Sequence, residues 1–165
     1  MDIIIICASH NKNLKLSKYI ENEIKKESLN TELIDLTQIN LPLYTSRLKD
    51  DSAIEIAEKY KEQLKSAKGF IFVAPEYNGS IPPVLSNFIA WISVCNKNWR
   101  EAFNEKPAVI ATHSGSGGLH CLMALRSQLS YIGLNVIGRQ IHTHFKKEIN
   151  KESVINVIQQ IKSNL

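Results

Sequence analysis

The sequence predicts an α/β fold, a parallel sheet of five strands covered by helices on both faces. Strand-like runs alternate with amphipathic helical patterns along the whole chain, which favours parallel strands joined by crossover helices. The runs DIIIICA, GFIFVA and PAVIATH are apolar without interruption, which is typical of strands buried on both faces. Each of these runs leads into a loop rich in Ser, Asn or Gly.

The first half of the chain is expected to supply three strands and two helices. Residues 2–8 form the first strand, and a helix follows because Leu16, Ile20 and Ile24 recur every four residues among Lys and Glu. TELIDL is the second strand, and a Pro-containing loop follows it. The second helix is marked by apolar residues at helical spacing, Ile54, Ala57, Tyr60 and Leu64. GFIFVA is the third strand, and Pro75 ends it.

The second half is expected to supply two strands and three helices. The segment from Pro82 to Val94 is helical, since proline is tolerated in a first turn. PAVIATH is the fourth strand and LNVIG the fifth, and the helix between them carries one apolar face. Asn150 can cap the last helix. The apolar faces of these two helices are Leu122, Leu125, Leu129 and Ile132, then Val154, Val157, Ile158, Ile161 and Leu165.

Length and composition indicate a single domain, residues 1–165. The chain is 44% hydrophobic and 22% charged, as in soluble globular proteins. The start of the chain reads as a strand rather than a signal peptide, and no sufficiently apolar stretch reaches the roughly 20 residues that span a bilayer. The three cysteines are far apart and form neither a disulfide framework nor a zinc spacing. We therefore expect a cytoplasmic protein without a membrane partner.

The charge pattern argues against nucleic acid and metal as partners. The net charge is +4, but Lys and Arg are scattered rather than clustered. Four histidines, His113, His120, His142 and His144, have no carboxylate or cysteine at a supporting spacing. No nucleic-acid surface and no metal site are expected.

Three loops follow strands at the edge where open α/β sheets bind ligands. The first, Ser9-His10-Asn11-Lys12-Asn13, lies between a buried strand and a helix start, where free N–H groups and the helix dipole favour an anion. It is not a nucleoside-triphosphate loop, because GxxxxGK[ST] is absent. An ordinary capping turn rich in Ser and Asn is the alternative.

The other two loops are PEYNGS, 75–80, and HSGSGG, 113–118. PEYNGS contains a glycine that can take positive φ, so the turn can direct several N–H groups at a planar ring. HSGSGG allows a close backbone approach, but His120 breaks the GxGxxG pattern and Ser114 breaks GxSxG. Each loop alone also fits a structural turn; their convergence at one sheet edge favours a binding site.

The block PEYNGS-x-P, followed by Asn87-x-Ile89-x-Trp91, resembles the signature of the NAD(P)H-dependent FMN reductase family. The resemblance continues through DLTQINLPLY, SGSGG and LRSQLSYIGLNVIG. It implies a flavodoxin-like three-layer sandwich. It also implies an FMN-dependent oxidoreductase, in which hydride passes from NADPH or NADH to flavin N5 and on to a flavin, quinone or azo acceptor.

The resemblance also implies which residues bind FMN, and it requires no catalytic side chain. The FMN phosphate would be held by Ser9, Asn11, Lys12, Asn13 and Leu14. The ring and ribityl chain would meet Pro75, Glu76, Tyr77, Asn78 and Gly79. The other edge of the ring would be flanked by Ser114, Gly115 and Gly117. Family members often carry Ser-x-Arg in the first loop, so here Asn11, Lys12 and Asn13 are expected to do that work.

Two other functions fit the predicted fold less well. A flavodoxin-type electron carrier without nicotinamide turnover is the alternative, but such carriers are usually acidic and this chain is basic. A receiver-type signalling domain would need acidic residues after the first strand and an Asp ending the third. This chain has Cys7-Ala8-Ser9 and Pro75 there.

The helix from Pro82 to Val94 has no charged side chain. Its large apolar residues fill about 160° of the helical wheel, and the rest is small or neutral. A helix packed only on its own sheet normally turns Lys or Glu to solvent. We therefore expect a homodimer through this helix, or a tetramer of such dimers; the alternative is a helix covered by loops of its own chain.

Overall fold

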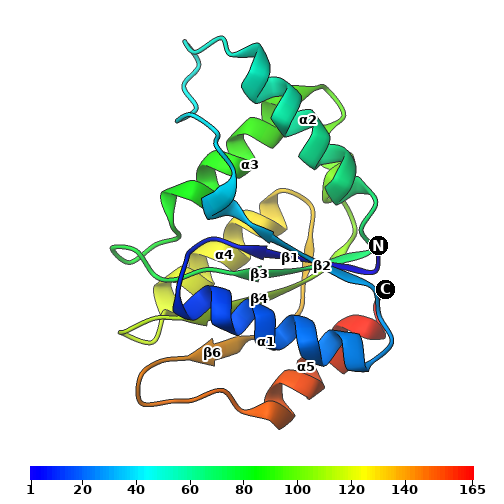
Figure 1. Cartoon of the computed structure of the whole chain (residues 1–165), viewed down its shortest axis with the longest axis vertical. Helices are drawn as coiled ribbons and strands as arrows, with labels where there is room; N and C mark the ends of the chain where they lie inside the picture. The colour runs from blue at the N-terminus through cyan, green and yellow to red at the C-terminus, as the bar shows by residue number, and fades with distance from the viewer.

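A six-stranded parallel sheet runs through the middle of the molecule, and helices cover both of its faces (Figure 1). The computed structural model describes all residues, 1–165. The strand order is β2-β1-β3-β4-β5, with β6 also paired to β4. The strands are β1 (Ile3–Cys7), β2 (Thr31–Asp35), β3 (Gly69–Val73), β4 (Pro107–His113), β5 (Asn135–Val136) and β6 (Ile141–Thr143). The predicted fold class is confirmed.

Helices alternate with the strands, close to the expected positions. They are α1 (Lys12–Lys26), α2 (Asp51–Lys65), α3 (Pro83–Cys95), α4 (Leu119–Tyr131) and α5 (Lys151–Lys162), with short 3₁₀ turns η1 (Leu36–Gln38) and η2 (Trp99–Ala102). The predicted cap of the last helix is confirmed, because the Asn150 side chain accepts the Ser153 N–H at 2.8 Å. None of these helices combines the length and the apolar character needed to cross a lipid bilayer.

The sheet separates two apolar cores, which explains the uninterrupted apolar runs. Along β1, Ile3 and Ile5 pack with α1 and α5, whereas Ile4 and Ile6 pack with α2, α3 and α4. All four isoleucines are at most 1% exposed. Successive side chains of a strand point to opposite faces, so a strand covered on both sides must be apolar at every position.

The fifth sheet position is divided, whereas the sequence predicted one strand at 134–138. β5 pairs only with the start of β4, and β6 pairs with its end, from Ala111 to His113. Between them the Arg126 guanidinium, from α4, donates to the carbonyls of Val136, Ile137 and Gly138 at 3.2, 3.0 and 3.3 Å. The Arg126 side chain therefore supplies hydrogen-bond donors to the carbonyls where the strand is interrupted. The sequence analysis did not predict β6.

Part of the second side of α3 is covered by its own chain. The Tyr60 ring of α2 meets Phe88 edge-on, with centroids 5.6 Å apart. The loop before α2 lies over the helix, since Asn87 Oδ1 accepts the Tyr44 N–H at 2.7 Å and Trp91 Nε1 donates to the Pro42 carbonyl at 2.8 Å. The missing charge on α3 therefore has an explanation within one chain, the alternative that the sequence left open.

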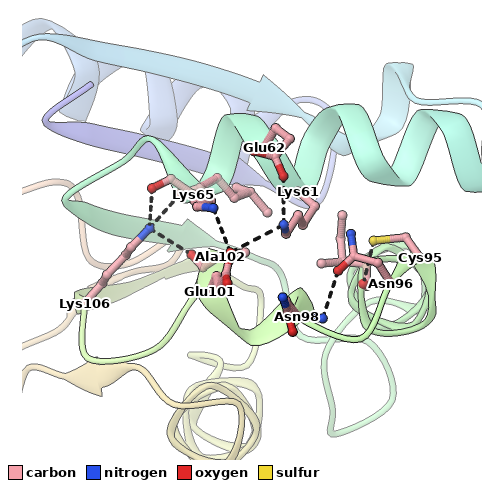
Figure 2. Close-up of polar contacts among 11 residues, drawn as sticks. Lys61, Glu62, Lys65, Cys95, Asn96, Asn98, Glu101, Ala102 and Lys106 are labelled. Carbon is pink, nitrogen blue, oxygen red and sulfur yellow. Dashed lines mark hydrogen bonds and ion pairs between the residues drawn. The ribbon is translucent and has the colours of Figure 1, made fainter.

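At the amino-terminal edge of the sheet, just before β4, backbone carbonyls accept hydrogen bonds from a lysine side chain (Figure 2). The Lys106 ammonium donates to the carbonyls of Leu64, Lys65 and Ala102 at 2.9, 2.9 and 3.2 Å. These contacts tie the end of α2 to η2. The same corner holds the ion pair between Lys65 and Glu101, 2.7 Å apart. A cation at a helix C-terminus also complements the helix dipole.

Candidate functional site

The first loop presents unused backbone donors at the start of α1. No hydrogen bond is made by the N–H groups of residues 9–14, although the Ala8 N–H just before them donates to the Val73 carbonyl at 2.9 Å. Asn11 has φ 60° and ψ −116°, and its side chain does not cap the helix. Free N–H groups at a helix N-terminus form a ready site for an anion.

Two polar side chains of this loop, those of Asn13 and Ser9, already have partners within the chain. Asn13 is 3% exposed, and its amide donates to the His113 carbonyl at 2.9 Å and accepts the His113 N–H at 2.8 Å. Ser9 Oγ donates to the His10 carbonyl at 3.2 Å. Lys12 is exposed and Leu14 is half-buried. The sequence analysis expected Ser9, Asn11, Lys12, Asn13 and Leu14 around a phosphate, and the donors that the structure leaves free in this loop are mainly backbone N–H groups.

The second loop is a tight two-residue turn. Tyr77 and Ser80 exchange backbone hydrogen bonds of 2.9 and 3.0 Å. Both residues between them have positive φ, 50° at Asn78 and 73° at Gly79, which is the pattern of a type I′ turn and explains the Asn-Gly pair. The N–H groups of these two residues donate to no acceptor. The turn carries the Tyr77 ring half-exposed at its base.

Glu76 fastens the second loop to the third. Its N–H donates to Ser114 Oγ at 2.7 Å, and its carboxylate accepts from Ser116 Oγ at 2.8 Å. The carboxylate also accepts the N–H groups of His120 and Cys121 at 3.0 and 3.2 Å, which caps α4. The hydrogen bond from Ser116, followed by those from the two amides, lowers the pKa of Glu76. The carboxylate therefore orders both loops, and its oxygens are already used.

The third loop approaches β4 too closely for ordinary side chains. Ser114 is buried, and its Oγ lies 2.8 Å from Thr112 Oγ1. A Cβ at Gly118, where φ is 71°, would lie 2.8 Å from Thr112 Cγ2. Gly117 has φ 98°, and Gly115 is exposed with open space around it. The glycines thus let the loop fold back tightly while leaving Gly115 open to a ligand.

Residues of β6 support this loop, and the sequence analysis missed them. The Ser114 N–H donates to the Thr143 carbonyl at 3.2 Å, and His113 Nδ1 lies 3.0 Å from Thr143 Oγ1. Burial, then the charge of Lys12, lowers the pKa of His113. The apolar and β-branched residues Ile141 and Thr143, two positions apart, were the available signal for a short strand.

A hollow of about 390 Å³ lies between the first and second loops. Ser9 and His10 line one side of it, and Tyr77 and Pro82 line the other. His10 and Thr37 also line it, although the sequence analysis did not place them among the FMN-binding residues. An apolar wall with N–H donors at the rim fits a planar ring that carries a phosphate, so these residues fit FMN.

Comparison with known proteins assigns the chain to a family. A sequence profile described as NADPH-dependent FMN reductase matches residues 1–148. The MG342 homolog of Mycoplasma pneumoniae, an uncharacterized protein, is 28% identical over 96% of both chains. The yeast NAD(P)H-dependent FMN reductase LOT6 is 30% identical over 74% of this chain and 66% of its own. A quinone reductase of Escherichia coli is 31% identical over 61% of this chain and 53% of its own.

The chain thus spans between half and two thirds of the length of these two named reductases. Solved structures agree on the fold. FerB of Paracoccus denitrificans, a flavoenzyme NAD(P)H:(acceptor) oxidoreductase, superposes with a TM-score of 0.75 at 19% identity, over 99% of this chain and 96% of its own. Flavodoxin 2 of Bacillus cereus superposes with a TM-score of 0.70 at 12% identity over the whole of both chains. With a profile match over most of its length and the loops described above, the chain belongs to the NADPH-dependent FMN reductase family.

Proposed function

We propose that this protein is an FMN-dependent NAD(P)H oxidoreductase whose single domain, 1–165, binds the flavin at the carboxyl edge of the sheet. The observation that carries the proposal is the row of unused N–H groups from residue 9 to residue 14 beside the hollow. Bound FMN would supply hydride transfer between the nicotinamide and an acceptor. The residues of the chain bind the flavin, orient it and shield it from water.

Each loop has its own part in gripping the flavin. The backbone N–H groups of Asn11, Lys12, Asn13 and Leu14, with the Ser9 hydroxyl, hold the phosphate. The N–H groups of Asn78 and Gly79 face one edge of the ring, and Ser114, Gly115 and Gly117 flank the other. Tyr77 supplies apolar packing, whereas Pro75 is buried and does not line the hollow. Asn13 and Glu76 act as positioning residues, because their side chains join loops to one another.

The electron acceptor is proposed to be a small molecule with a flat ring, such as a quinone, an azo compound or a free flavin. Named relatives include a quinone reductase and an NADPH azoreductase from Bacillus. The half-exposed Tyr77 ring at the mouth of the hollow offers such a molecule an apolar surface.

The proposed compartment is the cytoplasm, because three buried, unpaired thiols suit a reducing environment.

The test is a visible spectrum followed by an anaerobic addition of nicotinamide nucleotide. We expect the purified or FMN-reconstituted protein to be yellow, and to bleach rapidly on addition of NADPH or NADH. Protein that stays colourless after incubation with excess FMN would contradict the proposal. Protein that binds FMN but bleaches with neither nucleotide would instead be an electron carrier.

We also propose that the protein is a homodimer that uses the remaining exposed part of α3 together with α4. Large apolar side chains are exposed on α4, with Leu119 at 61% and Met123 at 63%. Pro83 and Val94 of α3 are exposed as well. Light scattering should give a dimer mass for the flavin-loaded protein and a monomer mass for Met123→Glu. A monomer mass for the wild type at micromolar concentration would contradict this proposal.

A further inference from the structure

A second groove, of about 390 Å³, lies on the other side of the first loop, between α1 and the segment that joins β6 to α5. Figure 1 shows α1, β6 and the connection from β6 to α5 on the lower side of the sheet. Its walls combine cationic and aromatic side chains. They include Lys12, Lys15, Tyr19, Phe145, Lys147 and Ile149.

The groove is lined by three lysines that form no ion pair. Lys12, Lys15 and Lys147 take part in none of the ion pairs of the chain. One acid, Glu148, also lines the groove and pairs with none of them. Unpaired ammonium groups around one hollow attract an anion.

The lysine charges contribute to the lowered pKa values of two neighbouring histidines. Burial is the main cause of the lowered pKa of His113, and the charge of Lys12 lowers it further. Burial likewise lowers the pKa of His142, and Lys147 adds to the effect. Both imidazoles are therefore less readily protonated than usual, and the lysines remain the cations that a ligand would meet.

The aromatic part of the groove is held in place. His144 and Lys147 exchange backbone hydrogen bonds of 3.0 and 2.8 Å, which closes a tight turn. The turn presents the Phe145 ring 71% exposed, with the Lys146 ammonium 5.7 Å from its centre. Across the groove, Tyr19 of α1 is half-buried. An exposed ring fixed beside cations offers a stacking surface for a flat, negatively charged molecule.

We propose that this groove binds a phosphorylated nucleoside, with its phosphates at Lys12, Lys15 and Lys147 and its base against Phe145. Lys12 belongs to the loop that flanks the flavin hollow, and His113, which lines the groove, is the first residue of the third loop of that site. The adenosine 2′-phosphate half of NADPH is therefore one source of the ligand, and this assignment rests on the proposed function. A free nucleotide acting as an effector is the other source.

The experiment measures binding of 2′,5′-ADP by titration calorimetry at low ionic strength, with flavin-free and FMN-loaded protein. The variants are Lys15→Ala and Lys147→Ala, with Lys18→Ala as the control because Lys18 is exposed on α1 but does not line the groove. We expect each of the two variants to weaken 2′,5′-ADP binding about tenfold, as loss of a hydrogen bond to a charged group does. The control should bind like the wild type, and FMN affinity should be the same in all four proteins.

Kinetics distinguish the two sources. If the ligand is NADPH, 2′,5′-ADP competes with it, and Lys15→Ala raises KM for NADPH while KM for NADH stays unchanged. If the ligand is an effector, 2′,5′-ADP binds without competing. Absence of 2′,5′-ADP binding at millimolar concentration, or equal binding by all variants, would overturn the proposal. Failure of FMN to bind would refute the proposed function. The titration of flavin-free protein with 2′,5′-ADP would still test the groove separately.

Discussion

Backbone groups at the two edges of the parallel sheet differ in their hydrogen bonding: carbonyls at one edge have a side-chain donor, and N–H groups at the other have no acceptor. At the amino-terminal edge, Lys106 supplies donors to the carbonyls of Leu64, Lys65 and Ala102 (Figure 2). At the carboxyl edge, the N–H groups from residue 9 to residue 14 have no acceptor. The Asn11 side chain does not cap α1, and the Asn13 side chain is committed to His113 in the third loop.

This difference separates a part of the molecule that holds the fold together from a part that is prepared to bind. The C-terminus of α2 receives a cation from the protein itself, whereas the N-terminus of α1 is left for an anion from outside. At the carboxyl edge, side chains such as Glu76 bind one loop to another, and the backbone is left to the ligand. Substitutions at the two edges should therefore have different effects.

The largest effect is expected from Asn13→Ala. The change removes the side-chain partner of the half-buried N–H and carbonyl of His113 and separates the first and third loops. The free energy of unfolding should fall by about 2–4 kcal/mol, and FMN should bind more than about tenfold more weakly. Chemical denaturation and flavin fluorescence measure the two effects. Asn22→Ala, at an exposed position of the same helix, is the control and should change neither.

Glu76→Ala should act mainly on binding. The change releases Ser116 and the N-terminus of α4, so the second and third loops lose their connection and FMN affinity falls about tenfold. Glu76→Gln keeps an acceptor and should lose less. Equal FMN affinity in the wild type and Glu76→Ala would show that the connection has no role in binding.

The ionised form of Glu76 also sets a pH dependence. Since its folded pKa is lowered, its stabilising contribution is complete above the unfolded value of 4.5 and is lost as the pH falls through the folded value. We expect the fraction of FMN released from the wild type to rise more steeply as the pH falls through this acidic range. Glu76→Gln should lack that step in an FMN fluorescence titration against pH.

Lys106→Met should act on stability alone. Removing the ammonium leaves carbonyls at the end of α2 without their donor, so the free energy of unfolding should fall by about 1–2 kcal/mol at pH 7. FMN affinity should stay as in the wild type. A loss of FMN affinity in this variant would show that the two edges are not independent.

The same variant tests the titration of Lys106. Burial, with a smaller effect of Lys65, lowers the pKa of Lys106 from 10.5 to about 8. Between these values the folded protein has lost a proton that the unfolded chain keeps, so the stability of the wild type rises with pH relative to Lys106→Met. Denaturation curves at several pH values from 7 to 10 measure that difference. A constant difference would show that the pKa is not lowered.

The smallest effect is expected from Ser9→Ala. The Ser9 hydroxyl already donates to the neighbouring His10 carbonyl, and the backbone N–H groups of the loop remain in place. FMN affinity should fall by no more than about threefold, well within the range of one neutral hydrogen bond. A loss as large as that of Glu76→Ala would mean that side chains rather than amides hold the phosphate.

Much of the fold could be predicted because local patterns determine it. The strands β1 and β3 are apolar at every position, and Asn78-Gly79 signals its turn directly. The parts that were missed depend on contacts between distant residues. Asn13 and His113 are 100 residues apart, and nothing near Asn13 in the sequence indicates that its amide is used there. The same holds for the Glu76 carboxylate and its partners in the third loop.

The helix α3 illustrates a pattern with two explanations. A helix without charge must be covered on both sides, but the sequence does not say by which chain. The structure covers the second side with Tyr60 and with the loop that contains Pro42 and Tyr44. Asn87 and Trp91, which the resemblance singled out, are the residues that hold this loop.

The most direct test of the account is an FMN titration of ¹⁵N-labelled, flavin-free protein, followed by amide NMR. Amides that gain a hydrogen bond to phosphate should shift strongly downfield, so we expect the largest changes at residues 11–14, smaller ones at Asn78 and Gly79, and none around Lys106. Large shifts confined to other parts of the chain, or no shifts with FMN in excess, would contradict the claim that the carboxyl edge keeps its amides free for the flavin.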